Sequence, residues 1–485
     1  MTPQAQLAML LWLPLTLYLF TRYSSQKAII LSFVGGLLFL PQSAGFKLPL
    51  IPDYAGMVAT CYGIMIGTLI YDSKKINQFT WSWIDIPMVL WCTCPMISSL
   101  TNDLGAYDGF NAVLEQSATW GLPYFLGRLY LNNLSGLSEL AIVMLKGGLI
   151  YVPLSLYEIR LSPQIHNMVY GYYAHASGIS QSIRLGGYRP NVFMSHGLVL
   201  AMFMTTVTLI AIWLWQSKTI KEVWGQPIIA WVALLVVTFI LMKSSGAYGY
   251  LIYGLVILFV AKWARLNFPL ILLMVLCVYY LYLGVIGAFS GAEVSDWIAK
   301  NYDPERAQSL QFRFENEELL REKALERPLF GWGGFGRNRV YAYDQWKGGI
   351  VDISVTDSYW IIVFGVNGVY GLVTFTLTLL TPVFVFAVFR YPAKTWLNPK
   401  VGPAAVLSVS LVLFFLDSLL NVGFNPTFPL ICGGLSGLVI KPVENLSDSP
   451  SASQKTKLPT KVKRSPTSRT RRGPIMGRNT ANLRR

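Results

Sequence analysis

The sequence predicts an all-α, polytopic membrane protein with about 12–13 transmembrane helices and one large, partly helical external loop. Charged residues make up only 13% of the chain, against about 25% in a typical soluble protein. Apolar residues make up 53%, and many stretches approach the roughly 20 apolar residues that a spanning helix needs. One soluble core is excluded, because these stretches are apolar on every face and too numerous to be buried elsewhere.

The expected spanning segments follow one another along most of the chain. They lie near 6–21, 28–41, 54–71, 82–100, 109–131, 135–157, 191–215, 227–242, 246–263, 268–289, 358–389, 403–421 and 425–440. The count is 12 or 13 because 109–131 is broken by Gly121 and Pro123, and because 358–389 exceeds one membrane thickness. The segment 28–41 is short for a span, as expected of a tilted or partly re-entrant helix.

Positive charge predicts the orientation of these segments. Lysines and arginines fall in every second loop, at Arg22, Lys27, Lys74, Lys75, Arg128, Lys218, Lys221, Lys262, Arg265, Arg390, Lys394 and Lys400. The positive-inside rule makes these loops cytoplasmic. The expected organisation is a membrane domain, 1–440, followed by a disordered basic cytoplasmic tail, 441–485, which carries 12 Lys/Arg against two acids. Such a tail beside a membrane helix fits anionic lipid and not nucleic acid.

Two long loops, 158–190 and 290–356, are expected outside, and both depart from the charge pattern. The first carries Arg160, Arg184 and Arg189. The second carries Arg306, Arg313, Arg321, Lys323, Arg327, Arg337 and Arg339. Long loops tolerate charge regardless of topology. Arginines placed directly against helix starts nevertheless predict a site that holds an anion near the outer membrane face.

The second external loop is expected to contain a helix. Asp303 is a good N-cap, Pro304 suits the first helical position, and the helix should end before Pro328. Its acidic and basic residues alternate, which is typical of a solvated, paired face. The following stretch, "PLFGWGGFGRNRV", is expected to form a tight turn that folds back on the membrane, because a lone glycine-rich run is weak support for phosphate binding.

Three stretches in order resemble the O-antigen ligase and O-antigen polymerase superfamily of bacterial membrane glycosyltransferases. The first is "RLGGYRPNVF", from Arg184 to the start of a membrane helix. The second is Arg313 on a helix that leads into "RPLFGWGGFG". The third is "TDSYWIIVFGVNGVYGL", which opens the next membrane helix. The resemblance covers roughly 110–440, and the single large external loop before the last helices agrees with it.

The resemblance implies an enzyme of the bacterial cytoplasmic membrane, with its active face external and with no metal or other cofactor. Such an enzyme takes a glycan from undecaprenyl diphosphate or a similar polyprenyl-diphosphate carrier and passes it to a hydroxyl group. The acceptor is a lipid A-core sugar of lipopolysaccharide in the ligases, another carrier-linked repeat in the polymerases of O-antigen and exopolysaccharide, and a protein side chain in related enzymes. A transporter or flippase for a lipid-linked saccharide is the alternative from another class, but it predicts ionisable groups near mid-membrane and repeat symmetry.

Arginines are the expected ligands of the carrier diphosphate, because the guanidinium group offers a planar fork of donors. Arg184 resembles the arginine of the family's first outer loop, and Arg313 resembles that of the second. Arg160 and Arg189 correspond more loosely and complete the set of candidate diphosphate ligands. For each of them the alternative is a headgroup or loop-packing arginine.

Asp357 is the candidate general base. The family has a histidine eleven residues before a glycine, and counting back from Gly368 places Asp357 at that position and Ser358 at the neighbouring asparagine. A carboxylate buried beside the bilayer could accept the proton of the attacking hydroxyl. Asp357 would equally suit the N-cap of the following helix. A register shift of one residue would put Thr356 in its place.

Lys243 and His196 are possible further substrate contacts. "KSSGAYG" departs from the family's Ser-Arg-Gly, so Lys243 is expected to supply the missing charge. His196 is expected one turn inside its helix near Arg189, either as a hydrogen-bonded structural residue or as a substrate contact. The three histidines, 9 and 21 residues apart, match no recognisable zinc pattern, and no metal site is predicted.

Overall fold

The structure is a computed structural model, and it describes residues 1–49, 51–175, 182–184, 186–288, 291–301, 304–345, 348–444 and 446. The chain divides into two compact units, Met1–Glu444 and Asn445–Arg485. The tail was predicted to be disordered. From Asn445 on, Leu446 is the one residue that the structure describes, so this prediction falls on residues outside those described. All the helices and strands of the described residues lie in the first unit.

The predicted all-α membrane fold is confirmed. In the described part of the chain, eight helices are long and apolar enough to cross a membrane. They are α1 (Pro3–Arg22), α5 (Ile86–Thr101, with the 3-10 turn η1, Trp83–Asp85), α8 (Leu134–Leu161), α10 (Gly197–Gln216), α12 (Ser245–Trp263), α13 (Phe268–Ile286), α16 (Tyr359–Val385, with the π turn η4, Phe386–Arg390) and α17 (Gly402–Leu420). Four shorter apolar helices are α2 (Ser25–Phe39), α3 (Gly56–Tyr71), α11 (Ile228–Leu241) and α18 (Thr427–Ile440).

The remaining expected segment, 109–131, is helical but composite. It consists of α6 (Ala106–Gln116), the π turn η2 (Ser117–Gly121) and α7 (Leu122–Tyr130). The remaining short helices are α4 (Ser73–Ile76), α9 (Ile165–Tyr170), α14 (Ala292–Asn301), α15 (Pro304–Leu325) and the 3-10 turn η5 (Ala393–Thr395). The π turn coincides with the Gly121–Pro123 interruption, where proline lacks the backbone donor that a regular helix requires.

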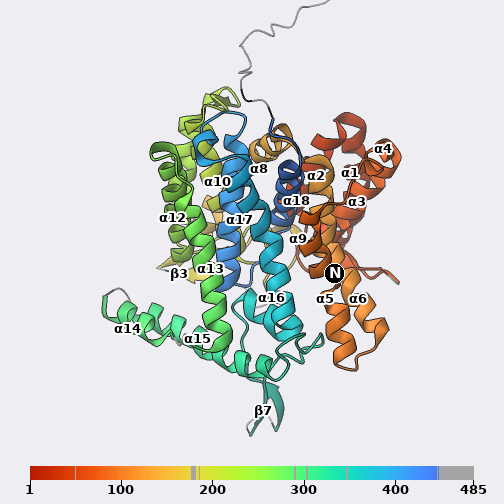
Figure 1. Ribbon diagram of the computed structural model, residues 1–485, viewed down its shortest axis with the longest axis vertical. Helices are drawn as coiled ribbons and strands as arrows, with labels where there is room; N and C mark the ends of the chain where they lie inside the picture. The colour runs from red at the N-terminus through yellow and green to blue at the C-terminus, as the bar shows by residue number, and fades with distance from the viewer. Residues whose placement is uncertain are drawn as a thin grey trace, which may run out of the picture. The chain divides into compact units, whose positions relative to one another are not determined.

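Four two-stranded antiparallel hairpins join the helices. They are β1 (Gly45–Phe46) with β2 (Tyr54–Ala55), β3 (Ile183–Arg184) with β4 (Gly187–Tyr188), β5 (Glu222–Val223) with β6 (Gln226–Pro227), and β7 (Tyr341–Asp344) with β8 (Gly349–Asp352). Each hairpin pairs neighbouring strands, so the described sheets contain no crossover. In Figure 1, the β7 hairpin lies with α14 and α15 at one end of the long helices.

The two most buried helices form the centre of the helical unit. In α10 and α17, 94% and 89% of the apolar stretch is buried, against 28% in α1. The two central helices pack on each other, and α10 also packs on α8, α11 and α12 (Figure 1). A helix that is apolar all round is stable only when it is surrounded by protein or lipid, and these two are surrounded by protein.

Helix α15 begins at Pro304, as predicted, and ends at Leu325, before Pro328. Its predicted cap, Asp303, lies outside the described residues. The glycine-rich stretch after it does fold back on a membrane helix: the Trp332 N–H donates to the Gly365 carbonyl at 2.8 Å. Further along, the Val369 N–H donates to the Pro328 carbonyl at 2.8 Å. Gly368 makes this docking possible, because its positive φ of 65° interrupts α16 and frees backbone groups for the loop.

One predicted boundary was wrong. The segment expected from residue 191 begins as a helix only at Gly197. The preceding residues are held in a non-helical conformation by Glu158, which is fully buried near the end of α8. Its carboxylate accepts hydrogen bonds from the N–H groups of Ile165 (2.9 Å), Asn191 (2.9 Å) and Val192 (2.7 Å). A charged acceptor with three donors outweighs the helical tendency of a few apolar residues.

Candidate site at the ends of α15, α16 and α17

Two of the predicted site residues meet although they are 44 positions apart in the sequence. Arg313, on α15, places its Nε atom 3.4 Å from Oδ2 of Asp357, which precedes α16. The two side chains are 31% and 37% exposed. The ion pair is therefore open to solvent, with a longer separation than a charge-assisted hydrogen bond usually has.

Arg313 is also held by the end of α17. Its Nη1 atom donates to the Leu420 carbonyl at 3.2 Å and to Oδ1 of Asn421 at 3.4 Å. The last carbonyls of a helix carry partial negative charge and have no partner within the helix, so a guanidinium group is well placed there. The cation thus bridges α15, the start of α16 and the end of α17.

A buried polar group, formed by Asp417 and Tyr250, orients the side chain of Asn421. Its Nδ2 atom donates to Oδ1 of Asp417 at 2.7 Å and to the Tyr250 hydroxyl at 3.4 Å. Asp417 is 3% exposed. Because the amide nitrogen of Asn421 donates to Asp417, its amide oxygen is turned toward Arg313 and can accept a hydrogen bond from the guanidinium group.

Glu317 lies one helical turn beyond Arg313 and ties α15 to two membrane helices. Its carboxylate accepts hydrogen bonds from the Ser358 hydroxyl and, at 3.3 Å, from the Tyr280 hydroxyl of α13. Burial raises the pKa of Glu317, while the hydrogen bond from Ser358 acts in the opposite direction. The carboxylate therefore anchors the residue next to Asp357.

The structure corrects two expectations about Asp357. Ser358 is the N-cap of α16, so Asp357 lies one residue before the cap, and the alternative of Asp357 as the N-cap is wrong. The expected burial beside the bilayer is not found either, because the side chain is 37% exposed. In this position both charges of the ion pair keep part of their hydration.

Lys243 lies against the hairpin that carries Arg184. A Cβ atom added to Gly187 in β4 would come within 2.4 Å of the Lys243 Nζ atom. Arg184 is in β3, paired with Gly187, and its side chain lies outside the described part of the structure. Lys243 lies two residues before the start of α12 at Ser245, and Tyr250 of the polar group lies little more than one turn into that helix. The hairpin that carries Arg184 and the polar group next to Arg313 therefore both lie near the start of α12.

Arg160 and Arg189 take other places. Arg160 is exposed in the last turn of α8. Arg189 is only 7% exposed and packs on the start of α10, where a Cβ atom on Gly197 would lie 2.9 Å from the Arg189 Cγ atom. Among the contacts that the structure describes, neither takes part in the Arg313–Asp357 pair. The packing of Arg189 agrees with the alternative predicted for it, a loop-packing arginine.

His196 is the N-cap of α10, not a residue one turn inside it. Its Nδ1 atom accepts a hydrogen bond from the Leu198 N–H at 3.1 Å, and its ring centroid lies 5.1 Å from that of His175. Accepting this bond requires Nδ1 to be unprotonated. The contact agrees with the structural role considered for His196.

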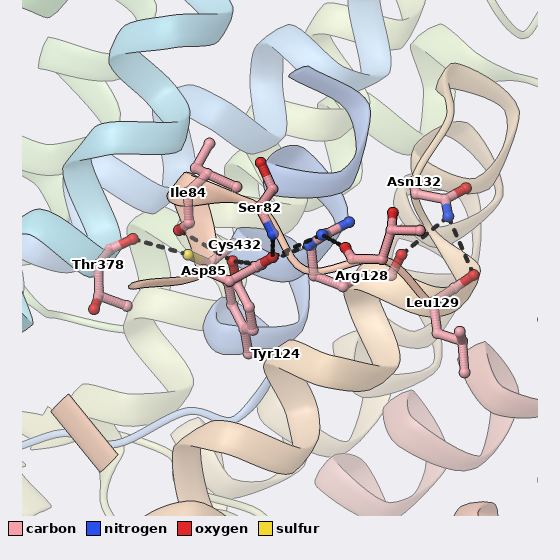
Figure 2. A network of polar contacts seen from close by, with 10 residues as sticks. Ser82, Ile84, Asp85, Tyr124, Arg128, Leu129, Asn132, Thr378 and Cys432 are labelled. Atoms are coloured by element: carbon pink, nitrogen blue, oxygen red, sulfur yellow. Dashed lines mark hydrogen bonds and ion pairs between the residues drawn. The ribbon is translucent and has the colours of Figure 1, made fainter. Parts of the chain in front are cut away.

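A second arginine–carboxylate pair lies elsewhere in the helical unit and is fully buried. Arg128, expected in a cytoplasmic loop, is in the last turn of α7 and only 4% exposed. Its Nε and Nη2 atoms lie 2.6 and 2.8 Å from the two carboxylate oxygens of Asp85. The Tyr124 hydroxyl and the Ser82 N–H donate to the same oxygens, at 2.7 and 2.9 Å (Figure 2). Each oxygen thus has two donors, as in a structural ion pair.

Four site residues were not predicted: Tyr250, Glu317, Asp417 and Asn421. Asp417 and Asn421 are four positions apart at the end of an apolar helix, so they share a face, and this spacing is a signal that the sequence does contain. Glu317 is one acid among several on α15 and carries no such signal.

No protein-family model matches the chain, and no curated protein matches it. The site is therefore interpreted from its own residues. Its features are an exposed guanidinium group, an adjacent carboxylate and a buried polar group behind them.

Proposed function

We propose that this protein is a membrane glycosyltransferase of the O-antigen ligase type, which moves a glycan from a polyprenyl-diphosphate carrier to a hydroxyl acceptor during surface polysaccharide synthesis. The observation that carries the proposal is the open pair of Arg313 and Asp357. These residues come from two of the three stretches that resemble the family. A cation beside a possible base is the minimum that this reaction requires.

The surroundings of Arg313 suit a diphosphate ligand. The described contacts engage its Nε and Nη1 atoms, and its Nη2 atom has no partner among the described residues. The N–H groups of Nη2 can donate hydrogen bonds to phosphate oxygens. As the bond between the sugar and the diphosphate breaks, negative charge grows on the leaving oxygen, and Arg313 stabilises it.

Asp357 supplies the complementary step. The acceptor hydroxyl oxygen attacks the anomeric carbon of the glycan, and its proton passes to the Asp357 carboxylate. The new carbon–oxygen bond replaces the one to the diphosphate, which leaves as an anion. When diphosphate binds, Arg313 moves away from Asp357. The carboxylate then becomes available to the acceptor.

The transferase is favoured over a transporter by the position of the buried acids. Asp85 precedes α5 directly, Glu158 lies three residues before the end of α8, and Asp417 lies three residues before the end of α17. A transporter of a charged lipid should have buried ionisable groups near mid-membrane, and Lys146, in the middle of α8, is exposed. A polymerase would use the same residues with a carrier-linked acceptor, so the two enzyme classes differ in the acceptor.

The proposed location is the bacterial cytoplasmic membrane, with Arg313 and Asp357 at its external face and the tail 441–485 inside. The basic loops support this orientation. A reporter fused after Lys441 should respond as cytoplasmic, and one inserted between 293 and 303 as external. The opposite pattern would reverse the orientation and exclude a periplasmic reaction.

The decisive experiment is Arg313→Ala. We expect glycan transfer from an undecaprenyl-diphosphate donor to fall about 10²–10³-fold, the usual effect of removing one group that stabilises developing charge. Transfer is measured with purified protein in nanodiscs and, in cells, as surface polysaccharide.

Arg321→Ala is the matched control. Arg321 lies two turns further along α15 and pairs with Glu318. Its loss should change transfer less than twofold, because a surface ion pair contributes little to stability. Full transfer by a well-inserted Arg313→Ala protein would overturn the proposed function.

A further inference from the structure

A cavity of about 330 Å³ lies where α4, α7 and the end of α18 meet. Figure 1 shows α4 at the end of the long helices opposite to α15 and the β7 hairpin, so this cavity is far from Arg313. Its volume falls within the roughly 300–1,000 Å³ of ligand pockets. Its lining includes the cations Lys75, Arg128 and Lys441 and, among the described residues, no acid. Positive charge is thus concentrated in one enclosed place.

The guanidinium group of Arg128 is only partly engaged within the protein. The residue is almost fully buried, and the Asp85 carboxylate and the Thr80 carbonyl accept from its Nε and Nη2 atoms at 2.6–2.9 Å. In the described part of the chain, its Nη1 atom has no hydrogen-bond partner. The guanidinium carbon also lies 5.1 Å from the centroid of the Phe79 ring, which restricts its movement. A fixed donor without a partner is suited to a ligand oxygen.

Asn132 positions the ammonium group of Lys441 in the same lining. A Cβ atom on Gly437 of α18 would lie 2.4 Å from the Asn132 Cβ atom, so this glycine lets the helix approach Asn132 closely. The Asn132 Nδ2 atom donates to the Arg128 carbonyl at 3.0 Å (Figure 2). Its Oδ1 atom is left to accept from the Lys441 Nζ atom at 2.7 Å. The ammonium group keeps two further N–H donors, which a ligand can use.

Lys75, on α4, supplies the second ammonium group of the lining. Its side chain takes part in no hydrogen bond or ion pair within the described residues. Burial lowers the pKa of Lys441, and the positive charge of Lys75 acts in the same direction. Arg128 adds to this lowering of the pKa, while Glu444 opposes it. The cations therefore repel one another, and an anion between them would relieve the repulsion.

Two nearby acids are occupied by other groups. The Asp85 carboxylate already has four donors, so its charge is matched by Arg128. The Oε1 atom of Glu444 accepts from the N–H group of Leu134, the first residue of α8, at 3.0 Å. Neither acid lines the cavity. The charges of Lys75 and Lys441 therefore remain for a ligand.

The rest of the lining suits a ligand that also has an organic part. Gln78 and Thr80, both exposed, add polar side chains. Leu129 of α7 and Ile440 of α18 add an apolar wall. A bare inorganic ion would leave this wall uncovered, whereas the carbon atoms of a small ester would cover it.

We propose that this cavity binds the phosphate group of a glycerophosphate or a similar phosphate ester, at the expected cytoplasmic end of the protein. The guanidinium group and the two ammonium groups offer donors to several oxygens of one phosphate, while a carboxylate has only two oxygens to share among them. The same chemistry is found in a soluble ester and in a phospholipid headgroup. The cavity lies apart from Arg313 and Asp357, so it goes beyond the proposed function and does not depend on it.

Gln78→Cys provides a local test in the full chain. Gln78 is exposed, and the five native cysteines are all buried, so the new thiol should be the main site of labelling. The rate of reaction with N-ethylmaleimide is measured in phosphatidylcholine nanodiscs at constant ionic strength, with phosphatidic acid or glycerol 3-phosphate as the probe. At least one probe should slow labelling about threefold or more, because the bound phosphate lies against the thiol. Slowing by phosphatidic acid alone identifies a lipid headgroup, and slowing by glycerol 3-phosphate identifies a soluble ester.

Ser73→Cys, at an exposed serine of α4 outside the lining, is the matched thiol control. Its labelling should proceed at the same rate with and without the probes. Equal slowing at Ser73→Cys and Gln78→Cys would overturn the proposal in favour of a general effect of surface charge. The absence of slowing by either probe at Gln78→Cys would also overturn it.

Two double variants with the same net charge test the cations themselves. Lys75→Gln with Lys441→Gln should raise the probe concentration for half-maximal protection about tenfold or more, because both cavity ammonium groups are lost. Lys74→Gln with Lys394→Gln removes two exposed lysines outside the lining. This second change should shift the same concentration less than about twofold, because exposed charges are screened by salt. Equal shifts in the two double variants would overturn the proposal.

Discussion

Two arginine–carboxylate pairs in this protein have the same chemistry and opposite surroundings. Arg128 and Asp85 are almost fully buried, and four donors satisfy the carboxylate at 2.6–2.9 Å. Arg313 and Asp357 are about one third exposed and 3.4 Å apart. The first pair has no hydrogen-bonding capacity left on its carboxylate, and the second retains capacity on both partners.

The difference shows how surroundings decide what an ion pair can do. A buried pair is lost only at a large cost, because removing one partner leaves an uncompensated charge. An exposed pair contributes little to stability, so its partners can separate when a ligand competes for the arginine. The Asp85 pair is thus suited to hold η1 against α7, and the Asp357 pair is suited to open for a substrate.

The largest expected effect is on stability at the buried pair. Asp85→Ala leaves Arg128 buried without its carboxylate and should lower the free energy of unfolding by about 3–5 kcal/mol. Unfolding by dodecyl sulfate, followed by tryptophan fluorescence, measures this change. Glu318→Ala removes the acid of a surface pair and should cost less than about 1 kcal/mol. Equal losses in the two variants would contradict the comparison.

The next effect is on turnover at the exposed pair. Asp357→Asn should reduce transfer about 10²-fold, because the amide cannot accept the proton of the acceptor, while undecaprenyl diphosphate binding is retained or tightened. Asp357→His should keep more activity than Asp357→Asn, since imidazole can serve as a base. Single-turnover assays separate these steps.

Asp352→Asn is the matched control for Asp357→Asn. Asp352 pairs with Arg339 at 3.6 Å with nearly the same exposure, but in the β7–β8 hairpin. It should change transfer less than twofold. Full turnover by Asp357→Asn, or a similar loss in Asp352→Asn, would remove the assignment of Asp357 as the base.

The smallest expected effect is a change in pH dependence at Glu317. Burial raises its pKa in the folded protein above the unfolded value of 4.5. The folded state therefore binds the proton more tightly, so this stabilisation is complete below the unfolded pKa and is lost as the pH rises through the folded pKa. Glu317→Gln should remove that component. As the pH rises from acidic to neutral, the unfolding midpoint of the unmodified protein should therefore fall relative to that of the variant. Parallel curves of unfolding midpoint against pH for the two proteins would contradict this.

Prediction from sequence worked where the signal is local. The start of α15 at Pro304 follows from the missing backbone donor and fixed φ of proline. The sequence also predicts the glycine-rich turn after α15. It does not predict that this turn docks on the break at Gly368, because the hydrogen-bond partners are more than 30 positions apart in the sequence. Arg313 and Asp357 were singled out separately, and nothing in either stretch predicts their contact.

Other residues could not have been assigned from the sequence. Arg128 looks like any basic residue in a cytoplasmic loop until Asp85, 43 positions earlier, is placed beside it. Asp357 was expected to be buried, but it pairs with Arg313 and is 37% exposed. Glu317 became part of the site only because α15 lies against the start of α16 (Figure 1).

The sequence by itself determined the helical membrane architecture and the candidate cations, since hydropathy, proline and charge act on neighbouring residues. The tertiary structure decided which carboxylates have all their hydrogen-bond partners within the protein and which remain open to solvent. The physical reason is that desolvation and hydrogen-bond satisfaction depend on every group within a few ångströms, wherever it lies along the chain.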